Sequence, residues 1–436
     1  MSSTTEKGTD LENRVLAVYQ QLGASRAIRD VRIAGHQVDV YIELIGVDGA
    51  LTRVAVECKN YAQRVGLNEA TIAAQKLVAI RQLGEVDAVT IVSEMGFTPD
   101  AIEVCQKFNV RAVTFFDLSK NLADFEPYLR NAVAQYEASR IFSEGLYRRL
   151  GATSEEGDAV GFADEFLMRH FTAGENLILL LGDYGTGKTT LAERIFWDAS
   201  RRHLASPATQ RIPLFIPLKR YRKEINLRSL VTDLLLHEYG VRIRDYYTVQ
   251  RLNDDGRLFL ILDAFDEMAS GADEAEVIAN FREILRLVVP KANVLLTCRT
   301  HFFKDQHQMY RAHHGTSLYQ DMEAGVKRLK LCYLAAYTPD DINSLVTQYC
   351  GSRASLYRNV IEGTYNLSEL APHPILLDMI LRTAPDQLAK GTVSTAADLY
   401  ELYTGFWLDR DDWRSHMNHE QRAFFMEELA LNLQLT

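Results

Sequence analysis

Several features that define whole classes of protein are scarce in this 436-residue sequence. Its five cysteines are odd in number and form no CxxC pair, which argues against a structural zinc site and for a reducing compartment. No apolar run approaches the ~20 residues that a bilayer-spanning helix needs. The first residues also lack the apolar core of a secretory signal. We therefore expect a cytoplasmic protein without a membrane segment.

An excess of positive charge is missing as well, because the formal net charge is −10 at pH 7. Contact with nucleic acid would then depend on a local site rather than on the field of the whole chain. The composition, 47% hydrophobic and 24% charged, is that of a folded globular protein. The length favours two or three domains.

The strongest motif lies near the middle of the chain, where the apolar run 177–181 ends in a glycine-rich turn and an amphipathic helix follows. This is the P-loop pattern, in which glycines let backbone N–H groups surround a di- or triphosphate at a helix N-terminus. We predict that Lys188 neutralises the β- and γ-phosphates and that Thr189 binds Mg²⁺. The predicted nucleotide site comprises Gly182, Gly185, Gly187, Lys188, Thr189 and Thr190.

Beyond the P-loop, apolar strand candidates alternate with helix patterns, which favours a parallel sheet with crossover helices. The candidates are 212–218, 257–263, 292–298 and 329–335. In such a sheet, ligands collect at the carboxyl ends of the strands. Asp263 ends one strand and Arg299 follows another, so we predict that Asp263 helps to hold Mg²⁺ and that Arg299 contacts the γ-phosphate.

Two further acids follow Asp263, namely Asp266 and Glu267. By themselves they are more typical of acids that a helix dipole favours at its N-terminus. A P-loop in the same chain favours the functional interpretation, in which Asp266 belongs to the nucleotide site and Glu267 polarises the attacking water.

Together these segments resemble the NACHT clade of STAND NTPases over about residues 175–410. The matching segments are Gly182–Thr189, Arg211–Leu218, Asp263–Glu267, Thr297–Arg299 and Leu370–Leu377. In the last of these the family packs a proline, here Pro374, against adenine. The resemblance implies an ATP- and Mg²⁺-dependent switch that becomes a homo-oligomer when a trigger, expected to be phage-derived, activates it.

The first 118 residues predict a compact α/β domain with the element order α-β-β-β-α-β-α-β. Helices are expected at 11–22, from a cap at Asn68 to Leu83, and from Pro99, with strands at 31–33, 37–44, 52–59, 86–93 and 110–117. Glu57 and Lys59 share a strand face, and Asp39 joins them if its strand is the neighbour. Two carboxylates there would hold Mg²⁺ or Mn²⁺ beside an ammonium that stabilises phosphodiester charge. A solvated strand face is the alternative.

The segments Gly35–Asp39 and Val56–Tyr61 resemble the PD-(D/E)xK nucleases, specifically the Mrr-like restriction endonucleases. The resemblance covers residues 8–118 and implies metal-dependent cleavage of double-stranded DNA. The implied roles are metal ligand for Asp39 and Glu57, catalytic base or charge stabiliser for Lys59, and auxiliary residue for Glu12 and Gln75. Val38 departs from the pattern, since the family name has proline there.

We therefore expect an α/β protein with four segments. They are a nuclease domain (1–118), a helical connector (119–150), a parallel-sheet NTPase domain (151–345) that opens with a surface loop at 151–158, and an α-helical region (346–436) that includes the start of a winged helix. Thr395 and Asp398 are spaced as a capping box. The amphipathic pattern continues to Thr436 without a stop signal, so we expect either a longer protein or a sensor elsewhere.

The leading functional hypothesis is an antiviral defence switch in which the NTPase controls the nuclease. A signalling scaffold with an inactive nuclease fold is the main alternative. A DNA-translocating motor is disfavoured, because the sequence has neither helicase-type motifs nor a basic excess.

Overall fold

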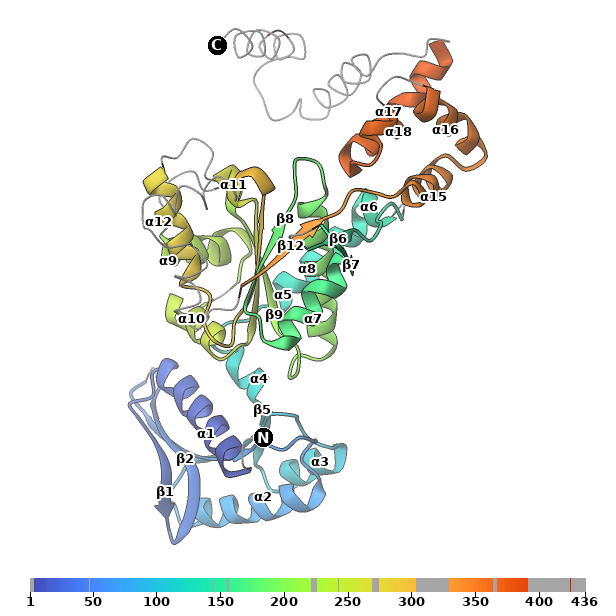
Figure 1. The fold of residues 1–436 in the computed structure, drawn as a ribbon. Coiled ribbons are helices and arrows are strands. Elements are labelled where there is room, and N and C mark those ends of the chain that lie inside the picture. Colours follow the sequence, from blue (N-terminus) through green and yellow to red (C-terminus); the bar gives the residue numbers. More distant parts are fainter. Residues whose placement is uncertain are drawn as a thin grey trace.

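The computed structural model describes residues 4–390, except 47, 144, 155–156, 221–225, 242, 269–273, 303–328 and 364–366, together with Phe424. Two α/β bodies follow each other along the chain, and α-helices follow the second (Figure 1). This is the predicted fold class. No described helix has the length and apolar character that a bilayer crossing requires. The predicted capping box at Thr395 and Asp398 lies outside the described residues.

A five-stranded sheet in the order β1-β2-β3-β4-β5 forms the centre of the N-terminal body. Its strands are β1 (Arg26–Ile33), β2 (His36–Ile45), β3 (Leu51–Lys59), β4 (Ala88–Ser93) and β5 (Arg111–Thr114). The first three are antiparallel and the last three are parallel. Parallel neighbours need crossover connections, and α2 (Leu67–Gln82) and α3 (Pro99–Lys107) provide them.

Helices cover both faces of this sheet. On one face, α1 (Thr4–Gln21) and α4 (Phe115–Ser119) pack against Val54 and Val56, whereas α2 and α3 pack on the other face around Ala55. Successive strand residues point to opposite faces, so Glu57 and Lys59 lie on the α2 side of β3. The strand alternation therefore decides which helix can reach the predicted nuclease residues.

Several boundary predictions in this body are wrong. The helix expected at 11–22 begins at Thr4, and the strand expected at 31–33 begins at Arg26. The strand expected at 110–117 ends at Thr114, which caps α4 by accepting a hydrogen bond from the N–H of Asp117. The apolar residues that follow are buried at helical spacing, which a short apolar run cannot distinguish from a strand. Asn68 is not a helix cap, because α2 begins at Leu67 after the extended Gly66.

A seven-stranded sheet in the order β7-β6-β12-β8-β11-β10-β9 forms the second body. Its strands are β6 (Gly151–Thr153), β7 (Ala159–Phe162), β8 (Leu177–Leu181), β9 (Ile212–Pro217), β10 (Leu258–Asp263), β11 (Asn293–Cys298) and β12 (Leu329–Leu334). The five long strands are parallel, as predicted. The expected surface loop at 151–158 instead contributes to an antiparallel hairpin at the sheet edge.

The parallel strands are mostly apolar, as expected where helices cover both faces of the sheet, although β10 ends in Asp263 and β12 contains Lys330. These helices include α7 (Ala163–Ala173), α8 (Lys188–Ala205), α9 (Leu227–Asp233), α10 (Tyr246–Asp254), α11 (Phe265–Met268) and α12 (Glu274–Leu285). The C-terminal helices α15 (Pro339–Cys350), α16 (Ala354–Gly363), α17 (Leu367–Leu370) and α18 (Pro374–Lys390) form a separate core.

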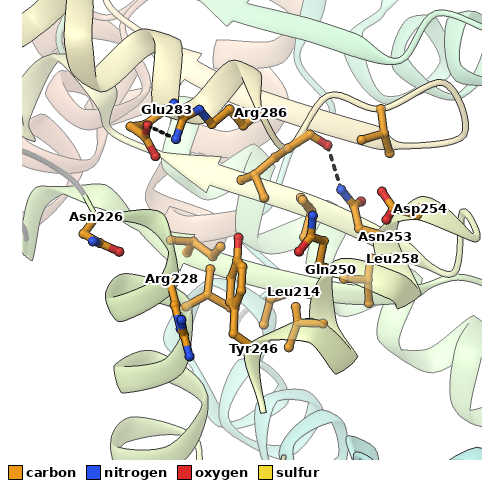
Figure 2. A pocket seen from close by; sticks show the side chains of 16 residues that line it. Leu214, Asn226, Arg228, Tyr246, Gln250, Asn253, Asp254, Leu258, Glu283 and Arg286 are labelled. Atoms are coloured by element: carbon orange, nitrogen blue, oxygen red, sulfur yellow. Dashed lines mark hydrogen bonds and ion pairs between the residues drawn. The ribbon is translucent and has the colours of Figure 1, made fainter. Parts of the chain in front are cut away.

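One part of the second body is hollow. A cavity of about 580 Å³ lies between α9, α10 and α12, above β9 and β10 (Figure 2). Leu214 and Leu258 line it from the sheet, and Tyr246 and Asn253 line it from α10. The amide of Asn253 donates a hydrogen bond of 2.7 Å to the carbonyl of Leu287. The cavity therefore borders part of the inner face of α10, while Val249 on that helix is packed in the core.

The stretch expected as a connector forms α5 (Glu126–Ala138) and α6 (Arg140–Ser143). Leu129 of α5 is fully buried in the same core as the strands of the second sheet. The ring of Tyr128 stacks on Tyr239 at 4.4 Å, and its hydroxyl accepts a hydrogen bond of 3.2 Å from the N–H of Phe215. In the structure, α5 is therefore packed as part of the second body.

Substitution Leu129→Ala tests this packing. We expect it to lower the free energy of unfolding of the second body by about 2–5 kcal/mol, the usual cost of leaving a cavity in a core. Gln135→Ala, on an exposed position of the same helix, should change it by less than about 0.5 kcal/mol. Chemical denaturation of the intact chain measures both. Equal stability of the two variants would place α5 outside the core.

Candidate functional sites

The glycine-rich turn after β8 has the backbone that its sequence predicts. Gly185 and Gly187 have φ of 75° and 93°, in the left-handed region that favours glycine. A Cβ on Gly182 would lie 2.7 Å from Thr186 Oγ1, so a side chain there would collide with the loop itself. The α8 helix then begins at Lys188, with its N-terminus directed at the turn.

The ammonium of Lys188 lies against the loop that precedes it. Its Nζ donates to the carbonyl of Gly182 at 2.7 Å and to that of Asp183 at 2.9 Å. Burial lowers the pKa of Lys188, and the nearby carboxylates of Asp266 and Asp263 partly oppose this. A phosphate oxygen is a stronger partner for an ammonium than a neutral carbonyl is, so this position suits a bound phosphate.

Asp263 is a buried carboxylate at the end of β10, with 2% of its surface exposed. It accepts hydrogen bonds from Thr189 Oγ1 at 3.0 Å and from Thr297 Oγ1 at 2.7 Å. Burial raises the pKa of Asp263, while the two threonine hydrogen bonds lower it. The P-loop helix and the strands β10 and β11 therefore meet at one carboxylate, where Thr189 and Asp263 could together hold Mg²⁺.

Thr297 is a site residue whose role the sequence did not reveal. It is fully buried on β11, and its Oγ1 also accepts a hydrogen bond of 2.8 Å from the N–H of Ala264. Ala264 has φ of 65°, an unusual backbone conformation for a residue other than glycine. The hydroxyl thus fixes the turn that follows Asp263. Thr297 reaches Asp263 because β11 lies between β8 and β10, and only the strand order decides this.

Asp266 and Arg299 form an ion pair at the carboxyl edge of the sheet. Arg299 Nε lies 2.7 Å from Asp266 Oδ2, and the backbone N–H of Arg299 donates to Asp266 Oδ1 at 3.1 Å. Asp266 is buried, whereas the side chain of Arg299 is 44% exposed and stacks over Tyr184. Asp266 therefore orients Arg299, and the exposed Glu267 follows it at the same cavity.

A cavity of about 440 Å³ joins the P-loop to the C-terminal helices. Pro374 begins α18, and the N–H of Ile375 donates to the carbonyl of Gly185 at 3.3 Å. The cavity is lined by Tyr147, Gly185, Gly187, Lys188, Thr189, Thr190, Asp266, Glu267, Arg299, Tyr337 and Pro374, among others. Its size lies within the range of small-molecule pockets. Its lining combines the P-loop and acidic groups with aromatic and apolar side chains, and it also includes Arg140, Arg148, Asp378 and Arg382.

Asp39, Glu57 and Lys59 come together at the ends of β2 and β3. The last pair of the β2–β3 ladder is Val40 with Val56. Asp39 precedes Val40 and Glu57 follows Val56, so both acids lie just beyond this pair. The carboxylate of Asp39 accepts a hydrogen bond of 2.7 Å from the N–H of Cys58, and Lys59 Nζ lies 2.9 Å from Glu57 Oε1. Burial and the neighbouring charge of Glu57 raise the pKa of Asp39. A divalent cation would relieve this repulsion.

A second lysine, Lys76 of α2, also contacts Glu57. Its Nζ forms an ion pair with Glu57 Oε2 and donates to the carbonyl of Gln37 at 2.9 Å. Glu57 is 6% exposed, so two ammonium groups compensate one buried carboxylate. Gln75, the predicted auxiliary residue, directly precedes Lys76 in the sequence, and its side chain is exposed. Adjacent helix residues point about 100° apart, and the sequence alone did not indicate that position 76 faces the site.

Glu12 of α1 approaches the same cluster. Burial raises the pKa of Glu12, and among neighbouring charges Asp39 raises it most. Within the described ranges, no group of three or more His, Cys, Asp or Glu side chains has the arrangement of a metal site. The donor set nevertheless fits Mg²⁺, which proteins commonly hold through one or two carboxylates while water and substrate phosphate complete the shell. Asp39 and Glu57 would be those carboxylates.

Family models match both bodies of the structure. Residues 4–122 match the Mrr-type restriction endonuclease model, and residues 176–325 match the NACHT domain model. The chain is also 29% identical over 363 residues to an uncharacterized WD repeat-containing protein of Nostoc sp. (strain PCC 7120). That match covers 76% of this chain and 23% of the relative, so the chain spans about a quarter of the relative's length.

Several solved structures are similar to parts of the chain. A repair endonuclease from Pyrococcus abyssi is 16% identical and aligns with 26% of this chain and 46% of its own, with a TM-score of 0.20. The Walker-type ATPase of Pyrococcus abyssi is 15% identical (57% and 73% covered, TM-score 0.34). The Aeropyrum pernix ORC1 protein, solved in complex with DNA, is 14% identical (57% and 67% covered, TM-score 0.34).

The two family models cover separate bodies of the structure, and their ranges include the predicted site residues except Pro374. This chain therefore combines an N-terminal Mrr-like restriction endonuclease domain with a NACHT NTPase domain.

Proposed function

We propose that the chain is an ATP-dependent switch of antiviral defence, in which the NACHT domain controls metal-dependent cleavage of double-stranded DNA by the nuclease domain. The observation that carries the proposal is the presence in one chain of two compact sites. One joins Lys188, Thr189 and Asp263, and the other joins Glu57 to two lysines. The proposed setting is the cytoplasm, with a phage-derived trigger and a homo-oligomer as the active form.

In the NACHT domain, we assign each group at the cavity a role toward ATP. The P-loop backbone and Lys188 would hold the phosphates, and Thr189 and Asp263 would hold Mg²⁺. Arg299, oriented by Asp266, would contact the γ-phosphate, and Glu267 would polarise the attacking water. The apolar and aromatic side chains of the lining, including Pro374, would receive the adenine.

In the nuclease domain, Asp39 and Glu57 would hold Mg²⁺ or Mn²⁺. The ion, when bound, would polarise the phosphodiester and lower the pKa of the attacking water. Lys59 keeps a positive charge beside Glu57, since that carboxylate raises the pKa of Lys59 against the opposing effect of burial. It is therefore placed to stabilise charge on the phosphate. Glu12 would assist from α1, and Gln75 keeps its predicted auxiliary role from the exposed side of α2.

Substitution Lys188→Ala tests the nucleotide site. We expect ATP affinity to fall about 10- to 100-fold, because a hydrogen bond to a charged group contributes about 1.5–3 kcal/mol. Isothermal titration of the intact chain measures this. Lys107→Ala, which removes an exposed lysine that pairs with Glu103 within α3, should bind ATP like the wild type. Equal ATP binding by Lys188→Ala would refute the assignment.

Substitution Glu57→Gln tests the nuclease site without a change in side-chain shape. We expect plasmid cleavage by the triggered protein to be lost and ATP hydrolysis to be retained, because the two sites lie in separate domains. EDTA should also abolish cleavage. Glu103→Gln, an exposed change in the same domain, should leave cleavage intact. Cleavage that persists in EDTA or in Glu57→Gln would remove the metal-nuclease mechanism. A wild type that never cleaves would favour the scaffold alternative.

Lys76 leads to a separate prediction, because a metal ion at Glu57 must compete with it. In Lys76→Met, we expect the Mg²⁺ concentration for half-maximal binding to fall roughly tenfold or more. A positive unit charge a few ångströms away weakens the binding free energy of a cation by on the order of 1–4 kcal/mol. Titration calorimetry with MgCl₂ in the absence of DNA measures the change, with Lys107→Met as the control. An unchanged or weaker Mg²⁺ affinity would show that Lys76 does not oppose the ion.

A further inference from the structure

A group of three charges connects the two domains. Glu94 follows β4 of the nuclease domain, and its side chain is 16% exposed. Its carboxylate lies 3.1 Å from Arg14 Nη1 of α1 and 3.8 Å from Nη1 of Arg257, the residue before β10 of the NACHT domain. Figure 1 shows the domains one above the other, with α4 between them. Glu94 is thus one carboxylate shared by arginines of two domains.

Glu94 is also attached to the nuclease site through the main chain. Its N–H donates to the carbonyl of Lys59 at 3.2 Å, and the preceding Ser93 pairs with Lys59 in the parallel ladder. Its other partner, Arg14, shares α1 with Glu12. A displacement of Glu94 would therefore shift the main chain of Lys59 directly, and through Arg14 and α1 it would also shift Glu12.

On the NACHT side, Arg257 is anchored to the chain that leads to the nucleotide site. Its guanidinium donates to the carbonyls of Ala208 and Pro207, each at 3.0 Å. Arg257 directly precedes β10, the strand that ends in Asp263. One rigid strand therefore has the nucleotide site at one end and the domain contact at the other.

The balance of charge makes this contact sensitive to Glu94. Burial lowers the pKa of Arg257; the carboxylate of Glu94 raises it, and the nearby charge of Arg14 lowers it. Without the carboxylate, the two largely buried guanidinium groups would lose the charge that they share. Asp10, 3.5 Å from Arg14, and Asp255, which raises the pKa of Arg257, would compensate them only in part. Separation of the domains would relieve the remaining repulsion. Glu94 thus supplies an attraction across the domain contact, which lies near the hydrogen bond from Arg244 to Leu122.

The packing around α10 is uneven and leaves room for motion. Arg251 and Leu252 of α10 lie at the domain contact, where only a space of about 40 Å³ remains and Phe116 packs edge-on against His203. The opposite face, with Tyr246 and Asn253, borders the cavity of about 580 Å³ (Figure 2). The cavity gives α10 room to shift, although such a shift would break the hydrogen bond from Asn253 to Leu287.

We propose that Glu94 is the positioning residue through which the NACHT domain controls the nuclease site. A nucleotide-dependent movement of β10 and α10 displaces Arg257. Glu94 then either moves with Arg257 or loses its contact with it. The main chain of Lys59 moves with Glu94, which changes the placement of the Lys59 ammonium beside Glu57. The inference rests on the proposed function for its catalytic consequence, whereas the mechanical coupling can be tested without DNA cleavage.

The test uses the full chain as wild type, Glu94→Gln, Arg257→Gln, the double variant and Glu103→Gln. Arg257→Gln leaves the Arg14–Glu94 pair intact, so it keeps the test valid if Glu94→Gln fails to fold. Hydrogen–deuterium exchange of the peptide spanning 56–61 is measured with and without ATP. Plasmid cleavage and its Mg²⁺ dependence are measured in parallel, and ATP binding serves as the control for the NACHT site.

In the wild type and in Glu103→Gln, we expect ATP to change exchange at 56–61 and to change the cleavage rate by about 5- to 150-fold, the usual range of coupling between sites. In Glu94→Gln, Arg257→Gln and the double variant, ATP should still bind. The ratio of the cleavage rates with and without ATP, and the ratio of the exchange rates at 56–61, should both approach one. Equal effects of the single and double variants would indicate one shared interaction.

The outcomes separate this inference from the proposed function. If the wild type never cleaves DNA but ATP alters exchange at 56–61 only while Glu94 and Arg257 are present, the coupling stands and the nuclease proposal fails. If ATP controls cleavage equally well in Glu94→Gln and Arg257→Gln, the inference is overturned and the nuclease proposal stands. An ATP-binding wild type without any change in exchange at 56–61 also overturns the inference.

Discussion

The buried carboxylate of Asp263 is the constraint on which the nucleotide site depends. A carboxylate with almost no exposure to water must be hydrogen-bonded, since leaving a buried acceptor unsatisfied is costly. Its two donors, Thr189 and Thr297, come from the P-loop helix and from β11. Three elements far apart in the sequence are therefore held at one point. The turn after Asp263 is fixed by the same threonine, which accepts from the N–H of Ala264.

In the nuclease domain, ammonium groups stabilise a buried carboxylate. Glu57 is buried, and Lys59 and Lys76 compensate its charge from two different elements. Asp39 instead accepts a hydrogen bond from the main chain at Cys58, and its pKa remains raised by burial and by Glu57. The site is thus a cluster of buried charges in close balance. A divalent cation and a phosphate, which bring opposite charges together, suit such a cluster.

The two domains contact each other directly and are not joined by a free linker. The helix α5 belongs to the core of the NACHT sheet although it immediately follows the nuclease domain, so the chain enters the second body as soon as it leaves the first. The carbonyl of Leu122 accepts a hydrogen bond of 3.1 Å from the N–H of Arg244, and Glu94 joins Arg14 to Arg257 nearby. These contacts place the edge of the nuclease site next to the beginning of β10.

The sequence by itself determined the fold class, the five parallel strands of the second sheet and the P-loop, because apolar periodicity and glycine spacing are local properties of the chain. It also indicated the five strands of the first sheet, but it missed the β6–β7 hairpin, whose short strands carry little apolar pattern. It also placed Glu57 and Lys59 on one face, since strand alternation has a fixed period of two. The pairings between distant segments were decided only by the tertiary structure. Thr297 reaches Asp263 through the strand order, Lys76 reaches Glu57 through the rotation of α2, and Glu94 reaches Arg257 across a domain contact. Each of these depends on how separate elements pack, and packing is a property of the whole fold that no single segment encodes.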